Sequence, residues 1–293
     1  MERPNPMKWL DEEAPTAAFL GNACDTGSVG GSGGLDLLGL PAGVATRGLA
    51  ALPEVGEEAA PVQRLLHEVL AVLEGYRAAD APVSFDAGHL DEANRTLLDQ
   101  TLGQGEVSIL VTGAAEYQIQ ESTLTGVWRI RTSDPLTGKR LGDHVEVGEV
   151  PALVRAAATG ATTADIPITE PPPGAMNVLP VLAEVRDRAA TYVSGTPNHV
   201  ISFTLLPMNP VDLEVLQATL GTGPVLALSR GYSSCRVVLT ARRNVWSVQY
   251  MNTQDKVVLD TLEVGDVPLA VRAADEDFAD SAARLKEILE AYY

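Results

Sequence analysis

Cysteine is almost absent from this sequence. Its 293 residues include only two cysteines, Cys24 and Cys235. Two cysteines are too few for the disulfide framework of a small secreted domain or for a four-ligand zinc site. The sequence also lacks an apolar run long enough to span a bilayer, and its first residues lack the apolar core of a signal peptide. We therefore expect a cytoplasmic protein with no membrane insertion.

Basic residues are also scarce. The chain has 21 Lys and Arg residues against 39 Asp and Glu residues, which gives a formal net charge of −18. Nucleic acids and anionic membrane surfaces are bound by clustered Lys and Arg side chains, and the sequence has no such cluster. The composition therefore argues against a nucleic-acid partner and favours a partner that carries positive charge.

The motifs of the common enzyme classes are missing. The sequence has no Walker loop, no dinucleotide fingerprint after a strand, no His-Glu-x-x-His and no Gly-x-Ser-x-Gly elbow. Its four histidines lie in separate predicted elements, and none pairs with another at the spacing of metal ligands. We expect a protein that is not an enzyme and has no catalytic residues, no bound metal and no cofactor.

The strongest feature that is present is an internal repeat. At a shift of 118 positions Trp128 falls on Trp246, and the Thr-Leu-Gly-x-Gly motif that begins at Thr101 recurs. The same shift places Ser84-Phe85 on Ser202-Phe203, so the match has no gap from about residue 83 to the tryptophans. We interpret the repeat as two homologous modules packed as a pseudo-dimer about an approximate two-fold axis.

One residue is lost after the tryptophans, and the repeat then continues. At a shift of 117 positions the run Glu146-Val-Gly-Glu-Val-Pro151 falls on Glu263-Val-Gly-Asp-Val-Pro268. The acidic residues of these runs either contact a partner or cap the helix that follows.

Composition and helix punctuation divide the chain into four segments. Residues 1–60 form a flexible, Gly-rich N-terminal arm with an extended segment. Residues 61–160 are the first module, residues 161–175 are a Pro-rich linker, and residues 176–293 are the second module. Each module shows the pattern of a helix, a strand, a second helix, several antiparallel strands and a last helix. The sequence therefore predicts an α+β fold.

The two tryptophans lie on predicted hairpins that are the candidate partner-binding sites. Trp beside Arg or Tyr is typical of interface hot spots. The candidate contact residues are Trp128, Arg129, Trp246, Gln249, Tyr250 and Asn244. In the alternative interpretation both tryptophans fill the cores of their modules. An exposed sheet edge beside the hairpins is the surface on which we expect an extended client segment to add as a strand.

Cys235 and Arg236 form a candidate thiol site. An arginine beside a cysteine lowers the thiol pKa and makes the thiol reactive. The alternative is that Cys235 is a small buried hydrophobic residue on a strand. A dimer would bring four cysteines together, which is the number that a standard iron–sulfur cluster requires. An iron–sulfur cluster carrier or a thiol redox factor is therefore the alternative function.

The second tryptophan hairpin also resembles a known family. The run Gly231–Asn252 and the run Leu259–Pro268 resemble the C-terminal signature of the HupH/HyaF-type hydrogenase expression/formation proteins. The resemblance extends over residues 40–293. The sequence departs from the family pattern at Ser247, where members often have a second Trp, and at Ala42-Gly43-Val44, where members have a Met.

The resemblance implies an accessory factor for the maturation of nickel–iron uptake hydrogenases. The implied client is the precursor of the small subunit, which carries iron–sulfur clusters and often a twin-arginine export signal. We expect a chaperone or scaffold that binds this precursor and, with it, other maturation proteins. The family supplies no reaction chemistry that can be transferred to residues of this chain.

Overall fold

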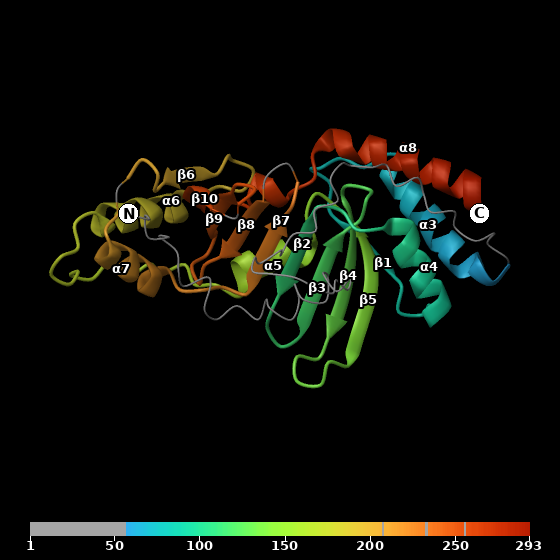
Figure 1. The fold of residues 1–293 in the computed structure, drawn as a ribbon, viewed down its shortest axis with the longest axis horizontal. Coiled ribbons are helices and arrows are strands. Elements are labelled where there is room, and N and C mark those ends of the chain that lie inside the picture. Colours follow the sequence, from blue (N-terminus) through green and yellow to red (C-terminus); the bar gives the residue numbers. More distant parts are fainter. Residues whose placement is uncertain (1–56, 207, 232–233, 255) are drawn as a thin grey trace, which may run out of the picture. The chain divides into compact units, whose positions relative to one another are not determined.

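One antiparallel sheet of ten strands organises the molecule (Figure 1). The computed structural model describes residues 57–206, 208–231, 234–254 and 256–293, which belong to one compact unit. Residues 1–56 of the predicted N-terminal arm lie outside the described residues. The fold is α+β, as the sequence predicted.

The described elements fall into two halves that have the same order of helices and strands from the first α-helix to the last strand. The first half, residues 57–160, contains a 3-10 turn at Glu57–Ala59, α3 Ala60–Leu73, β1 Val83–Asp86, α4 Glu92–Leu102, β2 Val107–Val111, β3 Glu116–Glu121, β4 Val127–Ser133, β5 Arg140–Val147 and α5 Ala152–Gly160. The second half, residues 175–293, contains α6 Val178–Thr191, β6 His199–Ser202, α7 Pro210–Leu220, β7 Val225–Ser229, β8 Ser234–Leu239, β9 Val245–Met251, β10 Val257–Val264, the 3-10 turn η2 Leu269–Val271 and α8 Asp275–Tyr292.

The strand order is β1-β5-β4-β3-β2-β7-β8-β9-β10-β6. The second five strands therefore repeat the order of the first five in reverse, and the two halves meet where β2 pairs with β7. Ile109 lies opposite Ala227 at the middle of this antiparallel pair. The β2–β7 pair thus continues the hydrogen-bonded ladder from one half into the other.

The register of the first strands corrects one detail of the sequence alignment. Phe85 of β1 lies opposite Val145, and Ile201 of β6 lies opposite Leu262. Because Val145 and Leu262 are 117 positions apart, β1 corresponds to β6 at a shift of 116 rather than 118. The predicted match of Ser84-Phe85 with Ser202-Phe203 is therefore wrong. The second half has two more residues than the first between this strand and the next helix.

The repeated Thr-Leu-Gly-x-Gly motif has a structural role. Gly103 and Gly221 end α4 and α7 with φ angles of 62°, which favour glycine. A Cβ atom at Gly105 or Gly223 would fall against a backbone carbonyl oxygen of the following hairpin. The motif therefore allows a helix to end close to the sheet in each half.

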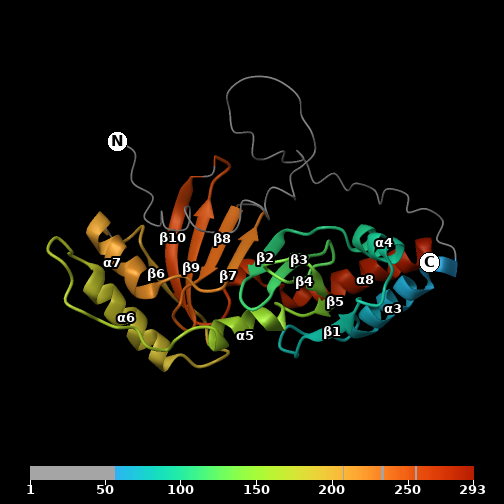
Figure 2. The ribbon, with the colours of Figure 1, turned by 90° about the horizontal axis from the view of Figure 1, so that it is seen from below.

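The final helix of each half packs against the other half. In Figures 1 and 2, α8 lies beside α3 and α4 of the first half. Phe278 and Leu285 of α8 share a core cluster with Leu66 of α3. In the opposite direction, α5 packs on β7, and Thr163 exchanges backbone hydrogen bonds of 3.0 and 2.7 Å with the β8–β9 turn. This exchange buries apolar surface of each half under a segment of the other.

An ionic network also joins the halves. Arg155 of α5 donates to Glu149 and to Asp266, with Nε 3.2 Å from each oxygen of Asp266. Arg272 donates from Nε to Glu149 at 2.7 Å. Glu149 is 7% exposed, so the two arginines stabilise a carboxylate that has little contact with water. Each half contributes one acid and one arginine, at positions 117 residues apart.

We expect Phe278→Ala to destabilise the whole unit. Phe278 is 1% exposed, and its ring centroid lies 4.8 Å from that of Tyr76 in the first half. Truncation of such a buried ring costs roughly 3–5 kcal/mol in the free energy of unfolding. Urea unfolding monitored by Trp fluorescence measures the loss. Leu269→Ala is the control, because Leu269 is 76% exposed. Equal stability of the two variants would contradict the packing of α8 on the first half.

Candidate functional site

The predicted partner-binding tryptophans lie inside the fold. Trp128 of β4 and Trp246 of β9 are both 0% exposed and belong to the core cluster that α5 covers. Trp128 Nε1 donates to the carbonyl oxygen of Gly148 at 2.8 Å. Both indoles therefore occupy core positions. Core packing was the alternative to partner binding in the sequence-based prediction. A partner cannot touch either indole while the sheet is intact.

The expected sheet edge beside the tryptophan hairpins is not there. β4 pairs with β3 and β5, and β9 pairs with β8 and β10. Among the described strands, the outermost are β1 and β6. The expectation of a free edge beside the hairpins is therefore wrong, because the long last strand of each half, β5 or β10, returns to cover that side.

Asn244 and Tyr250 lie at the two ends of β9. Asn244 forms the turn from β8 with a φ angle of 56°, and its carbonyl oxygen accepts from Gly265 at 2.8 Å. Asn tolerates this left-handed conformation better than most residues. Tyr250 is half-buried opposite Cys235, and burial raises its pKa to about 12. Both residues therefore have structural contacts that the sequence did not indicate.

Cys235 lies in an environment that suppresses thiolate formation. Its side chain is buried, and burial followed by the nearby charge of Glu263 raises the thiol pKa to about 12. Successive residues of a strand point to opposite faces, so Arg236 lies on the other side of the sheet. The expected activation of this thiol by Arg236 is therefore wrong. The structure favours the alternative of a small buried hydrophobic residue.

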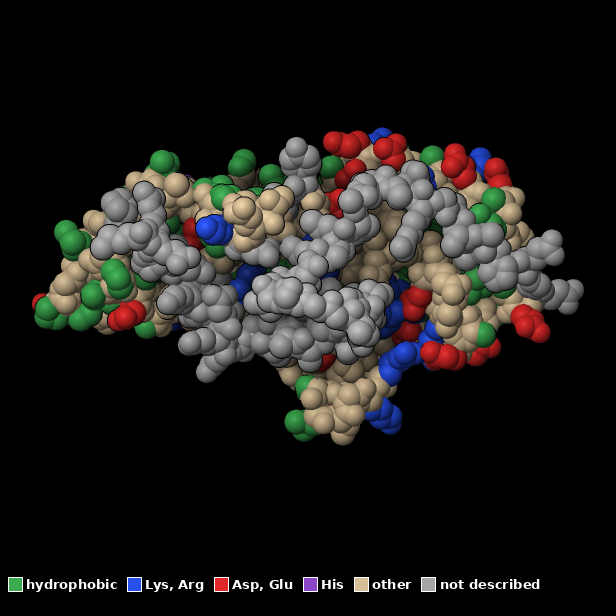
Figure 3. Space-filling view, in the orientation of Figure 1, with side chains coloured by type: hydrophobic (Ala, Val, Ile, Leu, Met, Phe, Trp, Pro, Cys, Tyr) green, Lys and Arg blue, Asp and Glu red, His purple; other side chains and the backbone are tan. Residues whose placement is uncertain are grey.

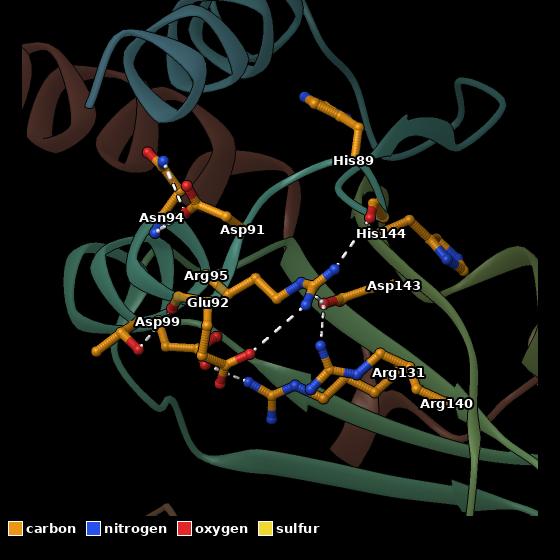
Figure 4. A network of polar contacts seen from close by, with 12 residues as sticks. His89, Asp91, Glu92, Asn94, Arg95, Asp99, Arg131, Arg140, Asp143 and His144 are labelled. Carbon is orange, nitrogen blue, oxygen red and sulfur yellow. Dashed lines mark hydrogen bonds and ion pairs between the residues drawn. The ribbon is translucent and has the colours of Figure 1, made fainter. Parts of the chain in front are cut away.

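Arg129 belongs to a charged network between β4, β5 and α4. Figure 4 labels three other members, Asp99, Arg131 and Asp143. The guanidinium of Arg129 donates to Asp143 at 2.9 Å and to Asp99 at 3.2 Å. Arg131 also donates to Asp99, at 2.5 Å. Arg129 and Asp143 are 4% and 2% exposed, so they form a buried ion pair rather than a surface contact. Of these four residues, only Arg129 was among the predicted partner-contact residues.

The same place in the second half contains the acid without the arginines. Asp260 lies opposite Gln249 on the neighbouring strand, as Asp143 lies opposite Arg131. Ser247 stands at the strand position that Arg129 occupies in the first half. Asp260 is 4% exposed, and burial raises its pKa to about 7 although Gln249 Nε2 lies 3.4 Å from its Oδ2.

A sequence signal for these acids exists. Asp143 and Asp260 fall on each other at the shift of 117 and interrupt otherwise strand-like runs. An acid at the same strand position in both copies indicates a buried carboxylate, because surface acids need no fixed position.

Other buried acids have local roles. Glu146 accepts from the backbone N–H of Ala152 at 2.6 Å, so it caps α5, as the capping alternative proposed. Glu121 is 5% exposed, and burial raises its pKa to about 7.

Within the described ranges, no three His, Cys, Asp or Glu side chains are arranged to hold a metal ion. In the same ranges, no helix combines the length and apolar character that crossing a bilayer requires.

Comparison with known proteins decides the family. The model of the C-terminal conserved region of the HupH hydrogenase expression protein matches residues 59–167 and again residues 175–292. The chain belongs to the HupH hydrogenase expression protein family. One family model thus matches both halves of this HupH-family chain.

Named relatives agree with this placement. The hydrogenase expression/formation protein HupH of Rhizobium leguminosarum bv. viciae is 47% identical over 231 residues, which cover 78% of this chain and 81% of the relative. The hydrogenase-1 operon protein HyaF of Escherichia coli K12 is 32% identical, over 83% of this chain and 80% of the relative. A solved structure of HupH from Thiobacillus denitrificans is 30% identical and covers 40% of this chain and 98% of its own, with a TM-score of 0.36.

We expect the Cys235 thiol to be unreactive in the folded protein. A thiol with a pKa of about 12 has almost no thiolate at pH 8. In a Cys24→Ser background, Ellman's reagent should react with Cys235 at least about 100-fold more slowly in the native protein than in urea. Fast native labelling would contradict the buried position of this thiol.

We expect Asp260→Asn to stabilise the protein at neutral pH. Burial raises the folded-state pKa of Asp260 from its ordinary value of 3.8 to about 7, so folding binds a proton between these pH values. Wild-type stability therefore falls as pH rises from about 4 to 7, and the variant lacks this contribution. Above pH 7 the variant should be more stable by roughly 2–4 kcal/mol. Thermal unfolding across this pH range measures the difference, with the exposed-site variant Asp280→Asn as control.

Proposed function

We propose that this protein is an accessory maturation factor for a nickel–iron uptake hydrogenase. It acts as a non-catalytic chaperone or scaffold in the cytoplasm. Family membership over nearly all of the described chain carries this proposal, because the relatives are named as hydrogenase expression/formation proteins. The buried Arg129–Asp143 pair and Glu146 support it, since these charged groups pair with each other or cap a helix.

We further propose that the client is the iron–sulfur small subunit in its precursor form. Electrostatics support this client, since a chain of net charge −18 attracts a segment rich in arginine. Figure 3 shows acidic side chains along α8 on the visible face. Such charges raise the rate of encounter more than the final affinity, and salt screens them.

We also propose that the two halves are duplicated modules related by an approximate two-fold axis through the Ile109–Ala227 pair. Three observations support this interpretation: the double match of one family model, the mirrored strand order and the paired positions in the ionic network. Superposition of the halves in an experimental structure tests it, with both tryptophan strands as the reference.

The iron–sulfur carrier or redox alternative receives little support. Cys235 is buried with a raised pKa, and Cys24 lies outside the described residues. Anaerobic reconstitution followed by iron and sulfide analysis tests the alternative directly. Maturation of active hydrogenase with a Cys235→Ser protein would remove it.

We expect the purified protein to capture the small-subunit precursor at low salt and to release most of it at high salt. Capture is measured with the precursor, with the precursor lacking its leader, and with the hydrogenase large subunit as the control client. Capture of the large subunit instead would contradict the proposed client. Absence of capture of any hydrogenase chain would contradict the proposed function.

A further inference from the structure

The strongest unexplained feature is the unequal environment of two equivalent carboxylates. Asp143 and Asp260 occupy the same position on β5 and β10 and face the same position on β4 and β9. Asp143 forms ion pairs with three arginines of the first half, Arg95, Arg129 and Arg140. Within the part of the chain that the structure describes, the polar side-chain contact of Asp260 is to the neutral amide of Gln249 at 3.4 Å.

The Asp260 carboxylate has unused hydrogen-bonding capacity. Among the described residues, its Oδ1 is buried and has no hydrogen-bond partner. A buried carboxylate without a cationic partner is costly, and native structures rarely retain one without a role. At the positions that correspond to Arg95, Arg129 and Arg140 the second half has Leu213, Ser247 and Val257, although it has an acid at the position of Asp143.

The first half shows that an arginine from the surface reaches this position. The side chains of Arg95 and Arg140 are 23% and 44% exposed, and their nitrogens lie 3.7 and 3.8 Å from Asp143. β6 pairs with β10 over Thr261–Val264, and the backbone N–H of Phe203 donates to the carbonyl oxygen of Asp260 at 3.0 Å, so the paired edge of β10 ends at Asp260. The adjacent residues Val258 and Leu259 are 56% and 37% exposed. A long cationic side chain therefore has a short path to Asp260 from this end of β10.

We propose that Asp260 is the receptor for an arginine side chain of a partner protein, held as the first half holds its own arginines. Gln249 lies beside the carboxylate, and Val258 provides apolar surface for the aliphatic stem of the arginine. The proposed function is thereby extended, because the partner group that is bound is specified as a guanidinium. This inference rests on that function only for the identity of the partner.

Ethylguanidinium, which reproduces the end of an arginine side chain, tests the site in the full-length protein. Ethylurea is the neutral probe of the same shape. The ¹³C signal of the Asp260 carboxyl, assigned by its loss in Asp260→Asn, should shift saturably with ethylguanidinium and stay unchanged with ethylurea. In Val257→Arg, which places an arginine at the position from which Arg140 reaches Asp143 in the first half, ethylguanidinium should lose its effect. No shift in the wild type, or equal shifts with both probes, would overturn the inference.

The precursor assay separates this inference from the proposed function. Asp260→Asn should weaken capture of the small-subunit precursor about 10- to 100-fold, the usual loss for a hydrogen bond to a charged group. Equal capture by wild type and variant would overturn the inference and leave the proposed function standing. A saturable ethylguanidinium effect without capture of any hydrogenase chain would support the site and contradict the proposed function.

Discussion

The antiparallel pairing of β2 with β7 is the constraint on which the rest of the structure depends. It merges the strands of both halves into one sheet, so the core around Ile109 and Ala227 belongs to neither half alone. Both tryptophans lie in this shared cluster. Their complete burial follows from the joined sheet and from α5, which covers it, rather than from the packing of one half.

The exchange of final helices strengthens this dependence. α8 contributes apolar side chains to the core of the first half, and the segment after α5 hydrogen-bonds to a turn of the second half. Glu149 contacts one arginine from each half, and a buried carboxylate that loses such partners is strongly destabilising. The interface therefore combines backbone pairing, apolar burial and compensated charge, and each term favours the joined state.

The two halves share a backbone plan but differ in charge. The first half compensates its strand carboxylate with arginines from α4, β4 and β5. The second half has neutral side chains at the positions of those arginines and exposes apolar residues at the adjacent end of β10. A repeated scaffold thus provides one half with internal ion pairs that stabilise it and the other with a carboxylate available for binding. The two halves therefore differ in the charge around this carboxylate although their strand order is symmetric.

The sequence by itself determined the order of helices and strands, because helix caps, strand alternation and turn residues act over a few neighbouring positions. It also identified the family, since the tryptophan runs and the Glu-Val-Gly run are local patterns. It did not determine which face of a strand each hairpin residue occupies in the assembled core, so Trp128 and Arg129 were grouped although they lie on opposite faces. Only the tertiary structure decided that the sheet is continuous, that the last helices are exchanged and that Asp260 is buried with no ion pair to another described residue. The continuous sheet and the packing of the last helices depend on contacts between residues more than 100 positions apart, where burial and charge are set by the partner element rather than by the local sequence.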